Sequence, residues 1–461
     1  MSNESANNSE NNSKNNNLTL VLFHNDLRVA DNATLSKAAE LSGNGQLLLV
    51  YGASLADGLS DKNNHPAYHY DTMGVARQQF LQESLIDLNA SLEQLGNRLL
   101  YLQQASAVSD TFAQLNELIK AQQVTDICVS KTDDYYQNQV YALLQNKHPQ
   151  ICWHIETTAT LFDELPLESL PKSFTQFRKK IEADYDLLHA EQDIATCSTP
   201  KKLSPMPEGM LNRNEYFFEA QSSDEIGLDE QTQQSSNFKG GETNGLKHLD
   251  EYFDSDAPST YKATRNALDE WTHSTKFSAW LANGSLSVNT VLNRLRRYER
   301  DVIANDSTYW IWFELLWREY FYWYAVTHQQ KLFWFKGIGE HTPSTQFDQK
   351  PLEKWKSGKT AYPIVNACMH QLKATGYMSN RGRQLVASCF IHELGLDWRY
   401  GAAYFEQHLI DYDVASNWGN WQYLAGVGAD PRGCRQFNLD KQTQQYDPNG
   451  EFIRQWQGEL E

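Results

Sequence analysis

The spacing of apolar residues changes once along this chain, and that change constrains the fold more than any other feature. Before about residue 160, short apolar runs alternate with segments of helical spacing: Leu18–Phe23 is strand-like, Ala33–Leu41 is helical, and Gln46–Tyr51 is strand-like again. From residue 246 onward the spacing is helical almost to the end. Tryptophan follows the same division, because Trp153 is the only one before residue 270 and twelve others follow. We therefore expect two domains of different construction.

The first domain, expected over residues 18–160, is predicted to be α/β with a Rossmann-like parallel sheet. The alternation continues with helical spacing over residues 81–95, a strand-like run over 98–102, a helical stretch over 112–122 and a strand-like run over 125–129. Such alternation is typical of a parallel sheet with helices on both faces, which binds ligands at the carboxyl ends of its strands. The sequence has no G-x-G-x-x-G and no P-loop lysine motif, so a conventional dinucleotide or ATP site is not supported.

The remaining segments differ in polarity. Residues 1–17 are rich in Asn and Ser and lack the apolar block of a signal peptide, so we predict a disordered leader on a cytoplasmic protein. No apolar run reaches about eighteen residues, so no membrane partner is expected. Residues 161–245 contain repeated prolines and a Gln/Ser-rich patch and are predicted to be a long interdomain connector. Residues 246–461 are predicted to form an all-helical domain.

The net charge of −18 argues against a simple nucleic-acid binder, because phosphate contacts need clustered Lys and Arg. The acidic excess is uneven, however. Residues 246–461 carry 25 acids and 23 bases, a net charge of −2, so a local basic groove can exist there. The six cysteines lie far apart, without a C-x-x-C pair or a His partner at metal-ligand spacing, so we expect buried, reduced thiols and no metal.

The densest group of chemically useful side chains lies between residues 397 and 438. It combines the indoles of Trp398 and Trp421 with the carboxylates of Asp411 and Asp413 and the amide of Asn417. Indole rings are large and easily oxidised, and a carboxylate or amide beside a ring cofactor sets its protonation and potential. This mixture favours redox chemistry on a planar cofactor. For any single tryptophan, packing in the core is the alternative.

Three further motifs have both a binding and a structural interpretation. The hydroxyls and lysine of Thr275–Ser278 precede an apolar helix, where they either hold a phosphate or cap the helix. Glu314 and Arg318 are four residues apart in an aromatic segment, so they share a helix face as an ion pair or as two arms around a ligand. Arg381 and Arg383 flank a glycine, which suits phosphate or carboxylate contact, or else forms a solvated basic turn.

Together these segments resemble the photolyase/cryptochrome flavoproteins and, within them, the DASH-type cryptochromes. The resemblance runs from Val21–Asn32, the family's opening strand and loop, to Gly450–Trp456, and so covers nearly everything but the leader. It implies an N-terminal α/β domain, a long connector and a helical domain that holds FAD.

The same resemblance implies a set of flavin contacts. Arg383 is implied as the partner of Asp411, and Asn417 as the residue that faces flavin N5. An amide there cannot readily supply the proton that an aspartic acid could, so the family logic favours an anionic reduced flavin reached by photoreduction. The implied cofactor-binding residues are Tyr261, Thr275, Lys276, Phe277, Ser278, Glu314, Arg318, Arg383, Asp411, Asp413 and Asn417.

Trp421 and Trp398 match the inner and middle members of the family's tryptophan relay, which refills the photoexcited flavin with an electron. Their separation of 23 residues equals that of the family. The outer position aligns with Thr345, so either Trp355 or Trp334 substitutes for it or photoreduction is slow. The predicted catalytic residues are Trp398, Trp421 and Asn417.

Substrate contacts are implied by the same alignment of motifs. Tyr423 stands where double-strand photolyases have a second tryptophan, and Gln384 where they commonly have methionine; both choices look DASH-like. A less apolar pocket stacks a flipped dimer more weakly, which favours single strands, where no pairing is broken. Glu314 is expected to hydrogen-bond the dimer and Arg381 to lie near its phosphate. The predicted lesion contacts are Glu314, Trp317, Asn380, Arg381, Gln384 and Tyr423.

A second cofactor, 5,10-methenyltetrahydrofolate, is implied as an antenna between the domains. In the family a glutamate of the α/β domain contacts it. The corresponding stretch here is Asp134–Gln139, in which Gln139 takes the place of that acid. Loss of the carboxylate is expected to weaken pterin binding.

The leading hypothesis is a FAD-dependent deoxyribodipyrimidine photolyase, a monomer that repairs cyclobutane pyrimidine dimers mainly in single-stranded DNA under blue light. The competing hypothesis is a photoreceptor that binds nucleic acid or a protein partner and signals without turnover. The sequence stops five residues after Trp456, and the expected lack of a long C-terminal extension favours the enzyme. A third interpretation is a nucleotide-binding α/β protein with a helical lid and no flavin.

Overall fold

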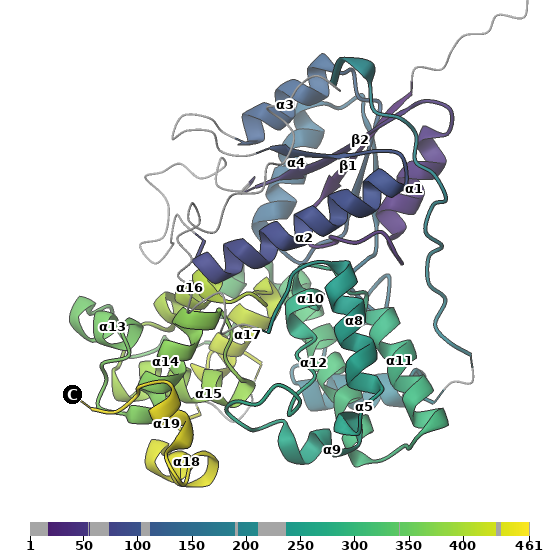
Figure 1. Cartoon of the computed structure of the whole chain (residues 1–461). Coiled ribbons are helices and arrows are strands. Elements are labelled where there is room, and N and C mark those ends of the chain that lie inside the picture. The colour runs from purple at the N-terminus through teal and green to yellow at the C-terminus, as the bar shows by residue number, and fades with distance from the viewer. Residues whose placement is uncertain are drawn as a thin grey trace, which may run out of the picture.

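The computed structural model describes residues 17–53, 55, 73–102, 111–189, 192–210, 237–340, 342–429 and 435–460. All of the predicted leader except Asn17 lies outside the described residues, as do residues 190–191 and 211–236 of the predicted connector and Cys434. Of the five described cysteines, Cys152 and Cys197 are exposed, so the prediction of buried thiols is wrong for these two. Figure 1 shows a sheet with its helices stacked on a larger helical part. The predicted fold class, α/β followed by an all-helical region, is confirmed.

The N-terminal part is a parallel sheet of five strands in the order β3-β2-β1-β4-β5. The central strand β1 pairs with β2 (Leu22 opposite Val50) and with β4 (Val21 opposite Cys128). Alternate residues of β1 enter two separate apolar clusters, one on each face, which explains its uninterrupted apolar run. The strands are β1 (Leu18–Phe23), β2 (Gln46–Gly52), β3 (Leu99–Leu102), β4 (Asp126–Ser130) and β5 (Cys152–Glu156).

Four helices cover the two faces of this sheet (Figure 1). Asn32 begins α1 by accepting a hydrogen bond from the Leu35 amide, and Asp134 begins α4 by accepting from the Tyr136 and Gln137 amides. The alternation recognised in the sequence ended at residue 129, so it did not include α4 or the edge strand β5. The helices are α1 (Ala33–Ser42), α2 (Val75–Gln94), α3 (Thr111–Ala121) and α4 (Tyr135–Lys147).

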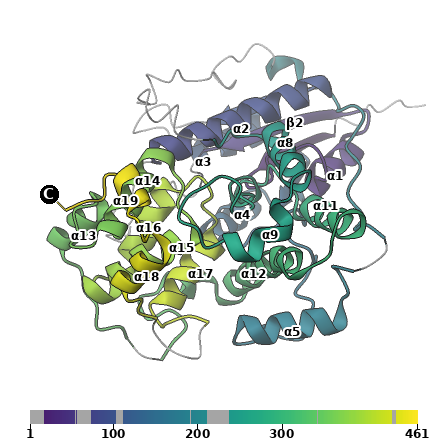
Figure 2. The ribbon, with the colours of Figure 1, turned by 60° about the horizontal axis from the view of Figure 1, so that its bottom comes forward.

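The predicted connector contains regular structure within its described residues. It carries α5 (Phe174–Asp184) and the short 3-10 helix η2 (Glu208–Met210). The apolar face of α5 is buried in the core of the helical part, where Phe174 stacks on Trp317 with ring centroids 3.8 Å apart. Figure 2 shows α5 against this part, far from the sheet. The boundary at residue 245 stays a prediction, and the next helix begins at Glu242.

The described part of the C-terminal region is helical, apart from one isolated bridge between Gln346 and Leu396. The longest helix, α12, begins with a capping box at Asn305 and runs through the core. The elements are α8 (Glu242–Phe253), α9 (Ala257–Thr264), α10 (Ser278–Ala282), α11 (Val288–Asp301), α12 (Asp306–His328), η4 (Gln329–Phe333), α13 (Gln349–Lys356), α14 (Pro363–Thr375), α15 (Asn380–Ser388), η5 (Cys389–Glu393), α16 (Trp398–His408), α17 (Val414–Leu424), α18 (Leu439–Tyr446) and α19 (Glu451–Gln455).

The two parts are joined by the loop after β1, which we call the Arg28 loop (residues 24–32). The buried Arg28 guanidinium donates to the carbonyls of Gly284 and Thr158, both at 2.8 Å. In return, the amides of Val29 and Ala30 donate to the Glu242 carboxylate at 2.8 and 3.0 Å. These bonds bind the loop to the helical part through groups that are costly to leave unpaired. Among the described helices, none is both long and apolar enough to cross a lipid bilayer.

Candidate functional site

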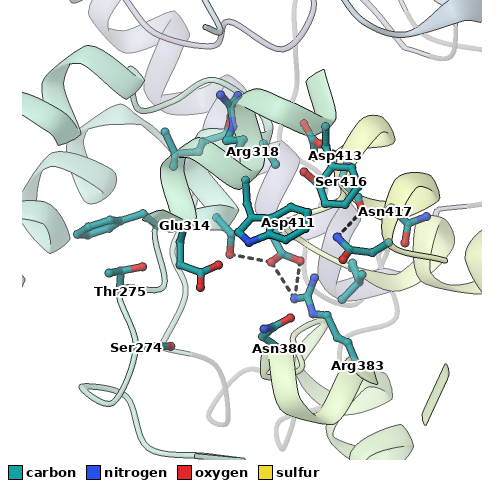
Figure 3. Close-up of a pocket in the computed structure, with 18 of the residues that line it drawn as sticks. Ser274, Thr275, Glu314, Arg318, Asn380, Arg383, Asp411, Asp413, Ser416 and Asn417 are labelled. Carbon is teal, nitrogen blue, oxygen red and sulfur yellow. Dashed lines mark hydrogen bonds and ion pairs between the residues drawn. The ribbon is translucent and has the colours of Figure 1, made fainter. Parts of the chain in front are cut away.

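A cavity of about 400 Å³ lies within the helical part, bordered by α9, α10, α12, α15 and α17 (Figure 3). Each of the eleven residues predicted to contact the cofactor is on its lining. Those residues are Tyr261, Thr275, Lys276, Phe277, Ser278, Glu314, Arg318, Arg383, Asp411, Asp413 and Asn417.

Asp411 and Arg383 form the main ion pair of the cavity wall. Arg383 Nη2 donates to both carboxylate oxygens of Asp411, at 2.9 and 2.8 Å, and its Nε donates to the Met378 carbonyl at 2.8 Å. Ser278 Oγ donates to Asp411 Oδ2 at 2.7 Å. Since the Asp411 side chain is only 3% exposed, these bonds compensate a buried charge. Asp411, in the loop between α16 and α17, thus connects Arg383 of α15 with Ser278 of α10 (Figure 3).

The loop before α10 turns sharply at Lys276. Its backbone φ of +56° is in the left-handed region, and the ammonium group donates to Ser274 Oγ at 2.9 Å. The ammonium also lies 5.1 Å from the centre of the Tyr377 ring. The helix-cap alternative is wrong, because α10 begins after Phe277 without a hydrogen bond from a capping side chain. All four residues of the motif line the cavity, and phosphate binding by them stays a prediction.

Glu314 and Arg318 share a face of α12 and are not paired with each other. The Glu314 carboxylate bonds to Arg265, while Arg318 donates to the carbonyls of Ala159 and Leu281. Burial raises the pKa of the Glu314 carboxyl, and the charge of Arg265 partly offsets that rise. Glu314 and Arg318 therefore line the cavity as two separate side chains with different partners and do not form an ion pair along the helix.

Asn417 lies on the first turns of α17, which begins when Asp413 Oδ1 accepts from the Ser416 amide at 2.7 Å. Asn417 Nδ2 donates to the carbonyl of Ala402 at 3.0 Å. That bond fixes the amide plane and leaves its oxygen and one N–H available on the cavity lining. The group presented to a ligand is thus a neutral amide held by α16.

The two predicted relay tryptophans occupy different places. Trp421 lines the cavity, and a Cβ at Gly401 would overlap its ring, so the tight contact with α16 requires glycine. Trp398 is fully buried off the lining and donates from Nε1 to the Phe335 carbonyl at 2.9 Å. Of the two candidate outer members, Trp355 is fully buried with its ring 6.3 Å from Trp421, whereas Trp334 is 39% exposed.

The predicted lesion contacts lie on the lining of the cavity, with one exception. Glu314, Trp317, Asn380, Gln384 and Tyr423 all line it. Trp317 and Tyr423 meet edge to face, with ring centroids 6.2 Å apart.

Arg381 is the exception, because it is not among the lining residues. Its guanidinium donates to Asn266 at 3.1 Å and to Gln442 at 3.4 Å, and it lies 4.8 Å from the centre of the Tyr446 ring. The sequence had placed Arg381 near the phosphate of a bound dimer. In the structure it links α15 to α18.

Several lining residues were missed by the sequence reasoning, namely Arg265, Ser274, Tyr377, Ser416 and Asn420. Helical spacing could have found two of them. Arg265 follows Tyr261 by one turn at the end of α9, and Asn420 follows Ser416 by one turn on α17. Tyr377 lies in a loop and has no comparable pattern.

In the stretch predicted to contact the folate, Tyr136 packs on Phe333 of the helical part, with ring centroids 5.1 Å apart. Gln139 is exposed on α4. The neighbouring Asp133 carboxyl is buried, which raises its pKa well above the ordinary value, and its Oδ2 has no hydrogen-bond partner. These contacts do not involve Gln139, so folate binding at this residue stays a prediction.

The chemistry of the lining fits FAD. A flavin needs an apolar surface for its ring, and Leu281, Phe405, Leu409 and Trp421 supply one. The diphosphate and ribityl chain need donors, and the ammonium group of Lys276 offers the N–H groups that it does not give to Ser274. The amide of Asn417 provides a polar contact of defined orientation.

The family models agree with this fit. Residues 19–200 match the DNA photolyase family, and residues 310–461 match the FAD binding domain of DNA photolyase. Cryptochrome DASH from Idiomarina loihiensis is 49% identical over 448 residues, which are 96% of this chain and 93% of the relative.

Solved structures give the same result. A Synechocystis cryptochrome superposes with a TM-score of 0.82 and 37% identity, covering 95% of this chain and 88% of the other. A bacterial class III photolyase from Agrobacterium tumefaciens gives a TM-score of 0.77 and 25% identity, covering 97% and 88%.

Proposed function

This chain belongs to the photolyase/cryptochrome family, among the DASH cryptochromes, and from that premise we propose that it is a deoxyribodipyrimidine photolyase acting mainly on single-stranded DNA. The family's FAD-binding domain is present in the helical part. When bound, FAD supplies the light-driven electron that opens the cyclobutane ring of a pyrimidine dimer. The residues of this chain bind the flavin and the dimer, orient them toward each other and shield them from water.

The observation that carries the proposal is the composition of the cavity wall. Next to Asn417, an expected flavin contact, and Trp421, the expected inner relay member, the same cavity lining contains Trp317, Gln384 and Tyr423. Aromatic rings stack a base that has left its helix, and an amide can hydrogen-bond its edge. A flavin and a flipped dimer can therefore share one enclosure.

Cationic groups near this wall suit a nucleic-acid backbone. Arg435 lies 4.6 Å from the centre of the Tyr423 ring, and Arg265 lies 5.3 Å from that of Trp310. Guanidinium groups held against aromatic rings bind phosphates in bidentate fashion and also stack on bases. Local cations of this kind can act despite the acidic total charge.

Glu314 has a particular role in the proposal. Its pKa is raised by burial, so it is more easily protonated than an exposed glutamate and can donate a hydrogen bond to a dimer carbonyl. The bond to Arg265 holds it in place before the dimer enters. Its function is to orient the dimer and stabilise charge on it.

The preference for single strands follows from the same wall. Tyr423 and Gln384 stack a flipped base less strongly than tryptophan and methionine would, so less energy is available to open a duplex. A loop or a single strand removes that cost. We further propose that the protein acts as a cytoplasmic monomer.

The experiment uses the flavin-loaded protein, chemically reduced, with an oligonucleotide carrying one thymine dimer. Under blue light we expect intact thymines to appear, at least about tenfold faster in the single strand than in the duplex, which corresponds to about 1.4 kcal/mol. Chemically reduced Trp421→Phe is the matched control and should repair at a similar rate, because the relay only refills the flavin. Unchanged dimer content with verified reduced flavin would refute repair and favour the photoreceptor alternative.

A further inference from the structure

Trp418 of α17 lies outside the cavity lining and next to the relay. Its ring is 2% exposed and meets Trp398 edge to face, with centroids 5.8 Å apart and an interplanar angle of 76°. Thr345, at the outer relay position, has no oxidisable ring. Trp418 therefore gives Trp398 an indole neighbour that the alignment of motifs did not assign.

The indole N–H of Trp418 points at a carboxylate. Trp418 Nε1 lies 3.2 Å from Glu406 Oε2 and 3.2 Å from the hydroxyl oxygen of Tyr412. A proton acceptor must lie within hydrogen-bond reach of the proton that it takes, and Glu406 meets that condition already in the resting structure. A negative charge at this position also favours the oxidised form of the indole.

Groups from several elements face Glu406. Arg77 of α2 lies 4.6 Å from the centre of the Tyr412 ring, while Asp134 and Tyr136 approach from the start of α4. Burial is the main cause that raises the pKa of the Glu406 carboxyl to about 7; Arg77 is the main opposing influence, and Asp134 adds a smaller upward contribution within that value. Near neutral pH, ionised and protonated forms of Glu406 are both populated.

We propose that Trp418 is the terminal electron donor of the relay and that Glu406 accepts its indole proton. This inference rests on the proposed function, in which an electron moves inward through Trp398 and Trp421. Trp418 gives one electron to oxidised Trp398 and becomes a radical cation, whose N–H is acidic. The proton moves to Glu406 Oε2, which leaves a neutral indole radical and a neutral carboxylic acid.

Restoring the resting state requires a reductant. A thiolate from solution returns one electron to the radical, and the resulting thiyl radicals couple to a disulfide. Glu406 returns the proton to Nε1, so that indole and carboxylate are both restored. The proton transfer delays charge recombination, because the electron cannot return alone to a neutral radical.

Transient absorption after a blue flash on the oxidised holoprotein distinguishes neutral from cationic indole radicals. We expect the neutral fraction to rise with pH through about 7, because only ionised Glu406 can accept the proton. Light-induced infrared difference spectra should show a new protonated carboxyl band. In Glu406→Gln the pH step and the band should disappear, and the radical lifetime should fall at least about tenfold.

Control variants separate this inference from the proposed function. Glu353→Gln, which changes an exposed glutamate of α13, should leave both signals unchanged. Trp418→Phe should remove the long-lived neutral radical, and Trp421→Phe should remove every radical. If Trp421→Phe still forms radicals, the proposed relay itself fails.

Two outcomes would overturn the inference alone. Radicals in the unaltered protein that stay cationic across pH 7 would exclude a proton acceptor, and that measurement needs no variant. A persistent pH step in Glu406→Gln with normal flavin content would assign the proton to another group.

Discussion

The Arg28 loop and the cavity wall each contain an arginine with several hydrogen bonds, yet the two differ in burial and in what surrounds them, since Arg28 is buried and the Arg383 side chain is 24% exposed. Arg28 gives every donor group to backbone carbonyls of both parts of the molecule. Arg383 is paired with Asp411, and that pair borders an open cavity. A polar network with all its partners inside the protein joins domains, whereas one that borders empty space can bind a ligand.

The largest expected effect on the comparison between the two arginines comes from replacing Arg28. Arg28→Ala removes the donors to Gly284 and Thr158 and leaves buried carbonyls unpaired, so we expect the free energy of unfolding to fall by about 3–5 kcal/mol. Chemical denaturation of purified protein measures this. Lys37→Ala, at an exposed ion pair, is the control and should change stability by less than about 1 kcal/mol. Equal losses in the two variants would contradict the role assigned to the loop.

At the cavity, Arg383→Ala leaves the Asp411 charge with Ser278 as its remaining partner. We expect a loss of about 2–4 kcal/mol in stability and at least about a tenfold weaker retention of flavin. Flavin absorbance per protein after dialysis reports binding, and denaturation reports stability. Arg383→Lys keeps the charge and should recover part of both. Full retention of flavin in Arg383→Ala would remove this ion pair from the binding site.

A third test concerns Glu319 of α12, which is 1% exposed. Its carboxylate accepts hydrogen bonds from the Leu161 amide and from Trp323 Nε1. Burial raises the pKa of its carboxyl from 4.5 to about 7. Its contribution to stability is therefore fully present below about pH 4.5 and is lost as pH rises through about 7.

Glu319→Gln should remove that part of the pH dependence, so that at pH above 7 the variant is as stable as the natural protein or exceeds it by about 1–3 kcal/mol. Denaturation at several pH values measures this. Glu406 titrates in the same range and should keep part of the slope. A variant with an unchanged slope would mean that Glu319 is already ionised in the folded protein.

The smallest expected effect is at Gln384. Gln384→Met makes the cavity wall more apolar, so we expect binding of a dimer-bearing duplex to tighten about threefold, or about 0.7 kcal/mol. Fluorescence anisotropy with matched single and double strands measures the affinities. Binding to the single strand should change less than binding to the duplex. Weaker duplex binding would mean that Gln384 hydrogen-bonds the substrate.

Much of this molecule could be predicted from its sequence. The strands and helices up to residue 129 follow their apolar spacing, and the family resemblance is confirmed. The cofactor residues, which the family resemblance implied, all line one cavity. Helical spacing accounts only for pairs such as Glu314 and Arg318 on α12. Edge strand β5 has mixed exposure and therefore weak periodicity.

Other features depend on tertiary contacts that spacing does not encode. Arg265 pairs with Glu314, 49 residues away, and no local pattern predicts that partner. Arg381 and Arg383 are alike in sequence, but a separation of two residues turns their side chains about 200° apart on α15 and gives them different neighbours. The contact between Trp398 and Trp418 likewise arises from the crossing of α16 and α17.

The five-residue helix α10 has a mechanical consequence. At one end, Ser278 holds Asp411; just past the other, the Asn283 carbonyl accepts from Leu27 and Gly284 accepts from Arg28. A Cβ at Gly284 would overlap the Asn25 carbonyl, so this end has no room to give. The helix, about 7.5 Å long, thus connects the cavity wall with the loop that follows the first strand of the sheet. Through these contacts, a displacement of Ser278 would reach the loop that follows β1.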